Sequence, residues 1–169
     1  MINFLNIRNH FPEYHENKSW WAYLYCKNIK DKPEVRKYIT DSYHAYNYCR
    51  NVKDRPEIRK YITSSYDALH YCRDIRDTKE IRSRITKSEY ALRYCCMTSR
   101  RHLDVIKNIT KSCHAYWYCK NIKDRPEVRK YITCSVWAYY YCREVKDRPE
   151  IRKLMTSDDL EEYIWWKNE

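Results

Sequence analysis

Apolar residues recur along this chain with the spacing of one face of a helix. Residues 112–122 show the pattern clearly, with apolar side chains at i, i+3, i+4 and i+7: Ala115, Tyr118, Cys119 and Ile122. This periodicity predicts a helix, because a strand would alternate apolar and polar residues. A second apolar stripe follows at residues 128–132 and predicts a second helix.

The turn between these two helices carries the signals of a helix start. Residues 124–127 read Asp-Arg-Pro-Glu, so an acceptor side chain lies three residues before a glutamate, as in a capping box. Proline suits the first turn of a helix, where its missing N–H removes no hydrogen bond. We expect each helix to be about ten residues long, too short to be stable alone, so packing between repeats must stabilise it.

The two-helix pattern recurs from residue 19 nearly to the end of the chain. Six cysteines, which we call the ladder cysteines, mark the copies with a period of 23 residues and one step of 24: Cys26, Cys49, Cys72, Cys95, Cys119 and Cys142. A fixed period of this length indicates stacked repeats, since one repeat cannot bury its own apolar face. The predicted fold class is all-α, a two-helix-repeat solenoid of six full units and a capping half unit.

We expect residues 1–169 to form a single α-solenoid domain. Within it, residues 1–18 form an N-terminal cap, residues 19–155 the repeats, and residues 156–169 a C-terminal capping half repeat. Trp165 aligns with the ladder cysteines, which predicts that it closes the last face of the core.

The fourth repeat departs from the pattern between residues 96 and 103. It is one residue longer than the others and lacks the Asp, Pro and Glu of the turn. Such a break reflects either sequence drift or adaptation to a contact. The basic residues Arg100 and Arg101 favour a contact with a partner.

Cysteine usage indicates the compartment. Nine cysteines would suggest disulfides in a small secreted protein, but six of them occupy one equivalent position per repeat. Such positions are expected roughly 10 Å apart, beyond the reach of a disulfide, so we interpret the ladder cysteines as small core residues in a cytoplasmic protein. No Cys or His spacing suits a metal and no segment suits a membrane, so we expect no metal, cofactor or membrane partner.

Positive charge is arranged by repeat. The formal net charge is +11, and Lys or Arg recurs in the turn, on the second helix and directly after the ladder cysteine. The surplus predicts attraction to an acidic macromolecule. The candidate binding cations after the ladder cysteines are Lys27, Arg50, Arg73, Lys120 and Arg143.

The first helix of each repeat also carries positions that differ from copy to copy. Constant positions serve stacking, so the variable ones are free for recognition. A solvated face would carry mainly Lys, Glu and Ser, whereas this one is rich in Trp, Tyr and His, which are typical of interaction surfaces. The candidate residues are Trp20, Trp21, Tyr43, His44, Tyr66, His70, Tyr90, Arg93, His114, Trp117, Trp137 and Tyr140.

Aromatic rings beside cations suit a single-stranded nucleic acid, whose bases stack on rings while its phosphates contact Lys and Arg. We therefore favour RNA, single-stranded nucleic acid or a ribonucleoprotein as the partner. The alternative is a protein-binding adaptor or inhibitor that binds an acidic protein surface. The Gly-free, Lys-, Asn- and Tyr-rich composition favours a viral origin, and an inhibitor of a host nucleic-acid machine would join both hypotheses.

An enzymatic role is not expected. With no Gly, the chain has no phosphate-binding loop, dinucleotide fingerprint or nucleophile elbow, and we expect no small-molecule substrate. Cys113 and His114 are not a catalytic pair, because neighbouring residues of a helix point apart.

The repeat resembles an uncharacterised family of short two-helix repeats. Its copies read roughly Ala-Leu-x-Tyr-Ala, a polar turn and Asp-x-Glu-Val/Ile, and residues 68–72 and 91–95 follow the first part of this motif. The chain departs from it by Cys in place of the second Ala, by Pro in the cap and by its Tyr content. The resemblance implies the solenoid fold and no activity.

Overall fold

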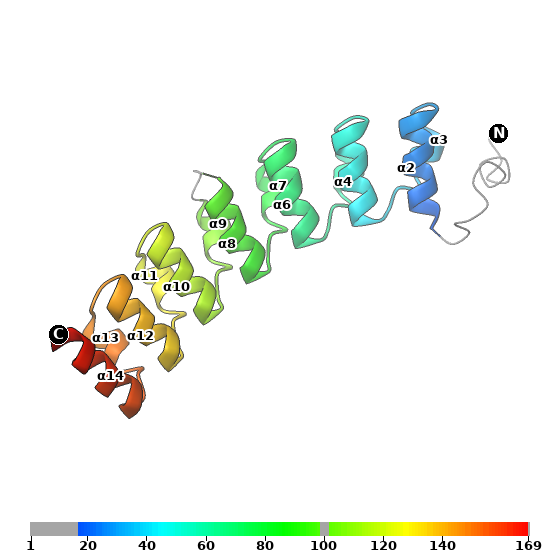
Figure 1. Ribbon diagram of the computed structural model, residues 1–169. Helices are drawn as coiled ribbons and strands as arrows, with labels where there is room; N and C mark the ends of the chain where they lie inside the picture. The colour runs from blue at the N-terminus through cyan, green and yellow to red at the C-terminus, as the bar shows by residue number, and fades with distance from the viewer. Residues whose placement is uncertain (1–16, 99–101, 169) are drawn as a thin grey trace. The chain divides into compact units, whose positions relative to one another are not determined.

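The computed structural model describes residues 17–98 and 102–168, and this part of the chain is helical with no strand (Figure 1). Helices of ten to twelve residues alternate with helices of four. The long helices are α2 (Lys18–Asn28), α4 (Ser42–Asn51), α6 (Ser65–Asp74), α8 (Ser88–Met97), α10 (Ser112–Asn121), α12 (Ser135–Glu144) and α14 (Ser157–Asn168). The short helices are α3 (Pro33–Arg36), α5 (Pro56–Arg59), α7 (Lys79–Arg82), α9 (Leu103–Ile106), α11 (Pro126–Arg129) and α13 (Pro149–Arg152).

The chain forms two compact units, one ending at Ile85 and the other beginning at Thr86. In the first unit α4 packs against α2 and α6, and in the second α10 packs against α8 and α12, while α12 packs against α14. Each short helix contacts the long helix before it. Within each unit the long helices lie side by side (Figure 1). The predicted fold class, a helical-repeat solenoid, is confirmed.

The second helix of the repeat is shorter than the predicted length of about ten residues. In the fifth repeat, α11 ends at Arg129, and the chain then tightens into bonds between residues three apart. Tyr131 N–H donates to the Val128 carbonyl at 3.0 Å, and Ile132 N–H donates to Arg129 at 2.9 Å. This tighter winding keeps Val128 and Ile132 buried while the chain turns towards the next repeat.

The predicted capping box is also wrong. The residue that precedes α11 is Arg125, and no side chain caps this helix. The carboxylate of Asp124 instead accepts hydrogen bonds from Arg129 at 2.7 Å and from Arg148 of the next repeat at 2.9 Å. The carboxylate bonds the guanidinium groups because both partners are then ionised, whereas a backbone N–H donor carries no net charge.

The turn aspartate therefore joins two repeats, in an arrangement that we call the inter-repeat bridge. Asp31 accepts from the hydroxyl of Tyr48 on the next long helix at 2.9 Å. Arg36 of its own repeat and Arg55 of the next donate to its other oxygen at 2.8 and 2.9 Å. Partial burial acts to raise the pKa of Asp31, but the bonds from Tyr48, Arg36 and Arg55 outweigh it and the pKa is lowered.

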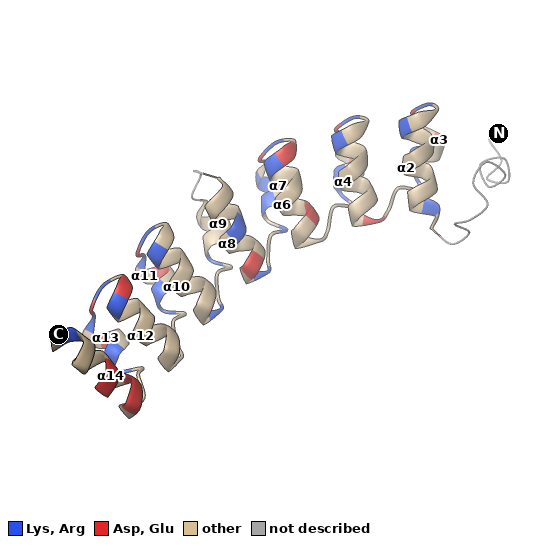
Figure 2. Ribbon diagram, viewed as in Figure 1, with Lys and Arg blue, Asp and Glu red and all other residues tan. Residues whose placement is uncertain are grey.

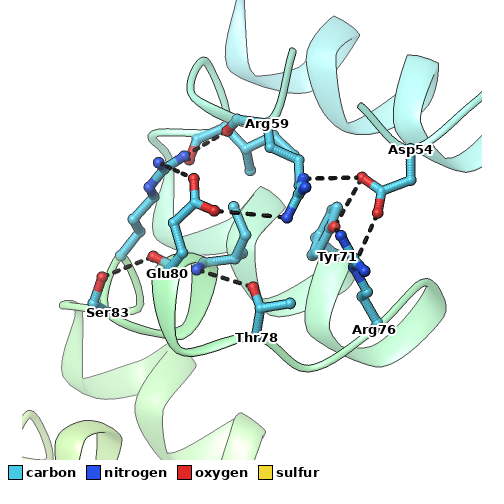
Figure 3. A network of polar contacts seen from close by, with 10 residues as sticks. Asp54, Arg59, Tyr71, Arg76, Thr78, Glu80 and Ser83 are labelled. Carbon is cyan, nitrogen blue, oxygen red and sulfur yellow. Dashed lines mark hydrogen bonds and ion pairs between the residues drawn. The ribbon is translucent and has the colours of Figure 1, made fainter. Parts of the chain in front are cut away.

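The third repeat builds the same bridge with different residues (Figure 3). Thr78 stands where the second repeat has Arg55, and it cannot reach the aspartate of the preceding turn. Arg76 takes this role, with its Nε 3.0 Å from Asp54, while Tyr71 donates to Asp54 at 2.9 Å and Arg59 lies 3.2 Å from it. The bridge is thus retained although its sequence signal has changed.

Serine at the start of a long helix makes a second link between repeats. The hydroxyl oxygen of Ser19 accepts from the backbone N–H groups of Thr40 and Asp41 at 3.2 and 3.1 Å, just before the next long helix. Ser88 holds Thr110 and Lys111 in the same way, at 3.0 and 3.1 Å. These bonds satisfy N–H groups that helix starts leave without a helical partner.

The core confirms that the ladder cysteines are small core residues, because all six are buried and free beside fully buried Ala, Tyr and Ile side chains. Trp165 does not close the core, since its side chain is 63% exposed. Tyr163, 22 residues after Tyr141, is buried instead. The last step of the repeat is therefore one residue short, which turns Trp165 away from the core. Residues 1–16 of the predicted N-terminal cap lie outside the described residues.

We expect Asp54→Ala to destabilise the first unit by about 2–4 kcal/mol. The substitution removes the nearer carboxylate of the Arg59 guanidinium, whose side chain is 10% exposed, and leaves it only Glu80 at 3.6 Å. It also removes the acceptor of the Tyr71 hydroxyl. Urea unfolding followed by far-UV circular dichroism measures the loss.

Glu57→Ala is the matched control for this variant. Its carboxylate is 51% exposed and lies 3.7 Å from Arg36, so its removal should cost less than about 1 kcal/mol. Equal losses in the two variants would show that the bridge does not stabilise the stack.

We also expect a thiol reagent such as DTNB to separate the nine cysteines into classes. Cys96 and Cys134 are exposed and should react fastest, with the half-buried Cys113 slower. The ladder cysteines should react only on unfolding, because burial protects them and raises the pKa of Cys49 to about 12 and that of Cys119 to about 11. Rapid labelling of a ladder cysteine in the native protein would contradict this packing.

Candidate recognition surface

Each long helix presents one exposed stripe, formed by the second, sixth and ninth residues counted from its serine. In α4 these residues are Tyr43, Asn47 and Arg50. The spacing of i, i+4 and i+7 places them on one face of the helix. We call this face the helix stripe.

Four aromatic rings on the stripes of α4, α6, α10 and α12 are exposed. Tyr43 and Tyr66 occupy the second position in the first unit, with exposed fractions of 53% and 44%. Trp117 and Tyr140 occupy the sixth position in the second unit, with 42% and 37%. Five other predicted aromatic and histidine residues are half-buried: Trp20, His70, Tyr90, His114 and Trp137. The last two, Trp21 and His44, are buried.

The prediction that Trp21 and His44 lie on the exposed face is wrong. Their exposed fractions are 8% and 7%. The ring of His44 lies 5.4 Å from that of Trp20 and stacks 6.4 Å from that of Tyr23, both on the preceding long helix. The third position is turned about 100° from the second and packs between neighbouring helices. This burial lowers the pKa of His44.

A cluster of rings lies beside one cation in the second unit. The ring of Trp137 stacks on that of Tyr116, with 5.2 Å between centroids, and the Trp117 ring packs edge-on to Tyr116, also at 5.2 Å. The ammonium of Lys120 lies 5.2 Å from the Trp117 ring and 5.7 Å from the Tyr116 ring. An exposed indole and a cation are thus held one helical turn apart.

Three of the five cations after the ladder cysteines form ion pairs with a carboxylate. Arg50 lies 3.6 Å from Asp74 of the next repeat, and Arg73 bonds the same carboxylate. Lys120 lies 2.7 Å from Glu144 of the next repeat. These three are therefore ion-paired as well as exposed.

The other predicted cations differ in their surroundings. Lys27 lies 5.8 Å from the Tyr23 ring, and Arg143 donates to the Tyr139 hydroxyl at 3.2 Å. Arg93 pairs with Glu89 at 3.0 Å within α8. Arg100 and Arg101 lie outside the described residues.

Four lysines that the sequence did not assign to the site are exposed in the turn after a long helix. We call them the turn lysines: Lys30, Lys53, Lys123 and Lys146. Within the described chain no carboxylate lies within ion-pair distance of them. A signal was available, since each turn supplies an Asp five residues before an Arg that can pair with it, which leaves the turn lysine unpaired.

Other kinds of site find little support in the described ranges. No group of three His, Cys, Asp or Glu side chains is placed to hold a metal there. None of the described helices has the length and apolar character needed to cross a membrane. The sequence matches no family model, no curated protein and no solved structure.

We expect acid to weaken the first unit through Asp74. The bond from Arg73, and after it that from the Tyr46 hydroxyl, lower the pKa of Asp74 to about 2. A carboxyl with a folded pKa below its unfolded value of about 4 stabilises the fold above that value and loses this effect as pH falls towards 2. The thermal midpoint should therefore fall over this range.

Asp74→Asn should remove part of this pH dependence, and Tyr46→Phe should reduce it by less. Circular dichroism melts at several pH values measure both variants. A profile for Asp74→Asn that parallels the unsubstituted protein would contradict the assignment.

Proposed function

We propose that this protein is a non-catalytic recognition module that binds single-stranded nucleic acid, RNA in particular, through its helix stripes. The observation that carries the proposal is the exposed ring of Trp117 with the ammonium of Lys120 beside it. Bases stack on such a ring, and the cation attracts the phosphate that follows. Net charge of +11 supports an anionic partner.

The variation of the stripes between repeats supports recognition rather than a purely structural role. In α4 the stripe reads Tyr43, Asn47 and Arg50, whereas in α10 it reads Cys113, Trp117 and Lys120. Stacking contacts do not require this difference, because the buried Ala, Tyr and Cys are the same in both helices. A surface that changes from repeat to repeat can contact successive parts of a linear ligand differently.

An acidic protein is the second candidate partner, and the ion pairs of the stripes favour it. Arg50, Arg73 and Lys120 already hold carboxylates, so part of the positive charge of the stripes is neutralised while the rings stay exposed. Exposed Tyr and Trp are the residues most enriched at protein-binding hot spots. A protein complex isolated from cells would survive nuclease, whereas a nucleic-acid complex would not.

We expect fluorescence anisotropy with labelled 20-nucleotide single-stranded RNA to detect binding that weakens steeply as salt rises. Trp117→Ala and Tyr140→Ala should each weaken binding by about 5- to 150-fold, which corresponds to about 1–3 kcal/mol per stacked base. Circular dichroism should show that both variants remain folded, because both rings are exposed.

Leu154→Ala is the matched control, since this apolar side chain is 38% exposed in the same unit but follows α13 and lies outside every helix stripe. It should leave the affinity unchanged. Absence of RNA binding, or binding that salt does not weaken, would reject the nucleic-acid proposal.

A further inference from the structure

The turn lysines are held in the same backbone position in four repeats. The N–H of Lys30 donates to the carbonyl of Tyr25 at 3.2 Å, where the long helix ends. The equivalent bonds of Lys53, Lys123 and Lys146 to Tyr48, Tyr118 and Tyr141 measure 3.2, 3.2 and 3.1 Å. The same carbonyl also accepts from the preceding residue, so the start of each turn is fixed twice.

Their side chains differ from those of the arginines around them. The arginines of the short helices face the inter-repeat bridge, with Arg36, Arg59 and Arg129 only 10–12% exposed. The turn lysines are exposed, and their ammonium groups have no carboxylate within ion-pair distance in the described chain. They are therefore cations that can meet a phosphate without breaking an existing ion pair.

In the third repeat the cation of the turn is ion-paired, unlike the turn lysines (Figure 3). Arg76 occupies the turn position and makes the same backbone bond, to Tyr71 at 3.3 Å. Because Thr78 replaces the bridging arginine, the Arg76 guanidinium points to Asp54 at 3.0 Å instead of remaining unpaired. Where an arginine occupies the bridging position, as Arg55 and Arg148 do, the turn cation stays unpaired.

The turn lies at the same end of the long helix as the ninth residue of the stripe, three residues further along the chain. Figure 2 shows Lys and Arg gathered at these turn ends, next to α2, α4, α10 and α12. A strand whose bases stack on the stripe would pass this end of the helix with its backbone.

We propose that the phosphodiester backbone of a strand bound to either unit contacts the turn lysines of that unit, which are Lys30 and Lys53 in the first unit and Lys123 and Lys146 in the second. This inference rests on the proposed function. It adds that the helix stripes and the turn lysines contact different parts of the strand. The rings of the stripes bind bases, and the turn lysines supply most of the salt-dependent part of the affinity. Arg50, Arg73 and Lys120 contribute less to it, because each already shares a carboxylate.

The test compares two pairs of lysines in the second unit with a labelled 20-nucleotide oligouridylate. Lys123→Gln with Lys146→Gln should weaken binding at least about tenfold at 50 mM salt and reduce the slope of log K against log salt by roughly 1.4. The matched control is Lys130→Gln with Lys153→Gln, two exposed lysines without carboxylate partners that directly follow the short helices. The control pair should change the slope by less than half as much.

A gain of affinity is expected where the regular turn is restored. Arg76→Lys with Thr78→Arg recreates the residues of the second repeat, so the new arginine can take the bridge and leave a lysine unpaired. This double variant should bind more tightly, with a slope steeper by roughly 0.7. A urea melt checks that the bridge at Asp54 is retained.

The outcomes separate this inference from the proposed function. Equal losses in the two lysine pairs, with RNA binding otherwise intact, would overturn the role of the turn lysines and leave the proposed function standing. Absence of RNA binding by the unsubstituted protein would overturn both. Competition by oligoglutamate as effective as that by unlabelled oligouridylate would overturn the phosphodiester assignment in favour of an acidic protein.

Discussion

The inter-repeat bridge is the interaction on which the rest of the structure depends. A four-residue helix and a ten-residue helix cannot persist alone in water, so each must be fixed by the next repeat. The apolar core supplies most of the driving force for this packing. The turn aspartate adds directional bonds to it, because Asp31 accepts from Tyr48 and Arg55 of the following repeat and from Arg36 of its own.

The bridge also explains why arginines and lysines occupy different places in the repeat. Arginine offers several donors in a rigid plane and can bond a carboxylate and a hydroxyl together, as Arg148 does with Asp124 and Tyr141. Lysine offers a single hydrated ammonium and stays at the surface. The arginines of the short helices therefore face the neighbouring repeat and stabilise the stack, whereas the turn lysines remain open to a partner.

Irregular repeats show how much tolerance this arrangement has. In the third repeat the bridge survives the loss of its usual arginine because Arg76 lies close enough to replace it. The replacement removes one cation from the turn position. Changes that preserve stacking can thus alter the exposed surface, which is how an array of similar repeats can acquire a specific pattern of contacts.

The sequence by itself determined the repeat, the long helices and the buried ladder, because a helical period and a fixed spacing depend only on neighbours along the chain. It did not determine the length of the short helices, the partner of Asp124, the burial of Trp21 and His44 or the exposure of Trp165. Each of these depends on side chains about one repeat away. Which face a residue shows to solvent is decided only when the neighbouring helix packs against it.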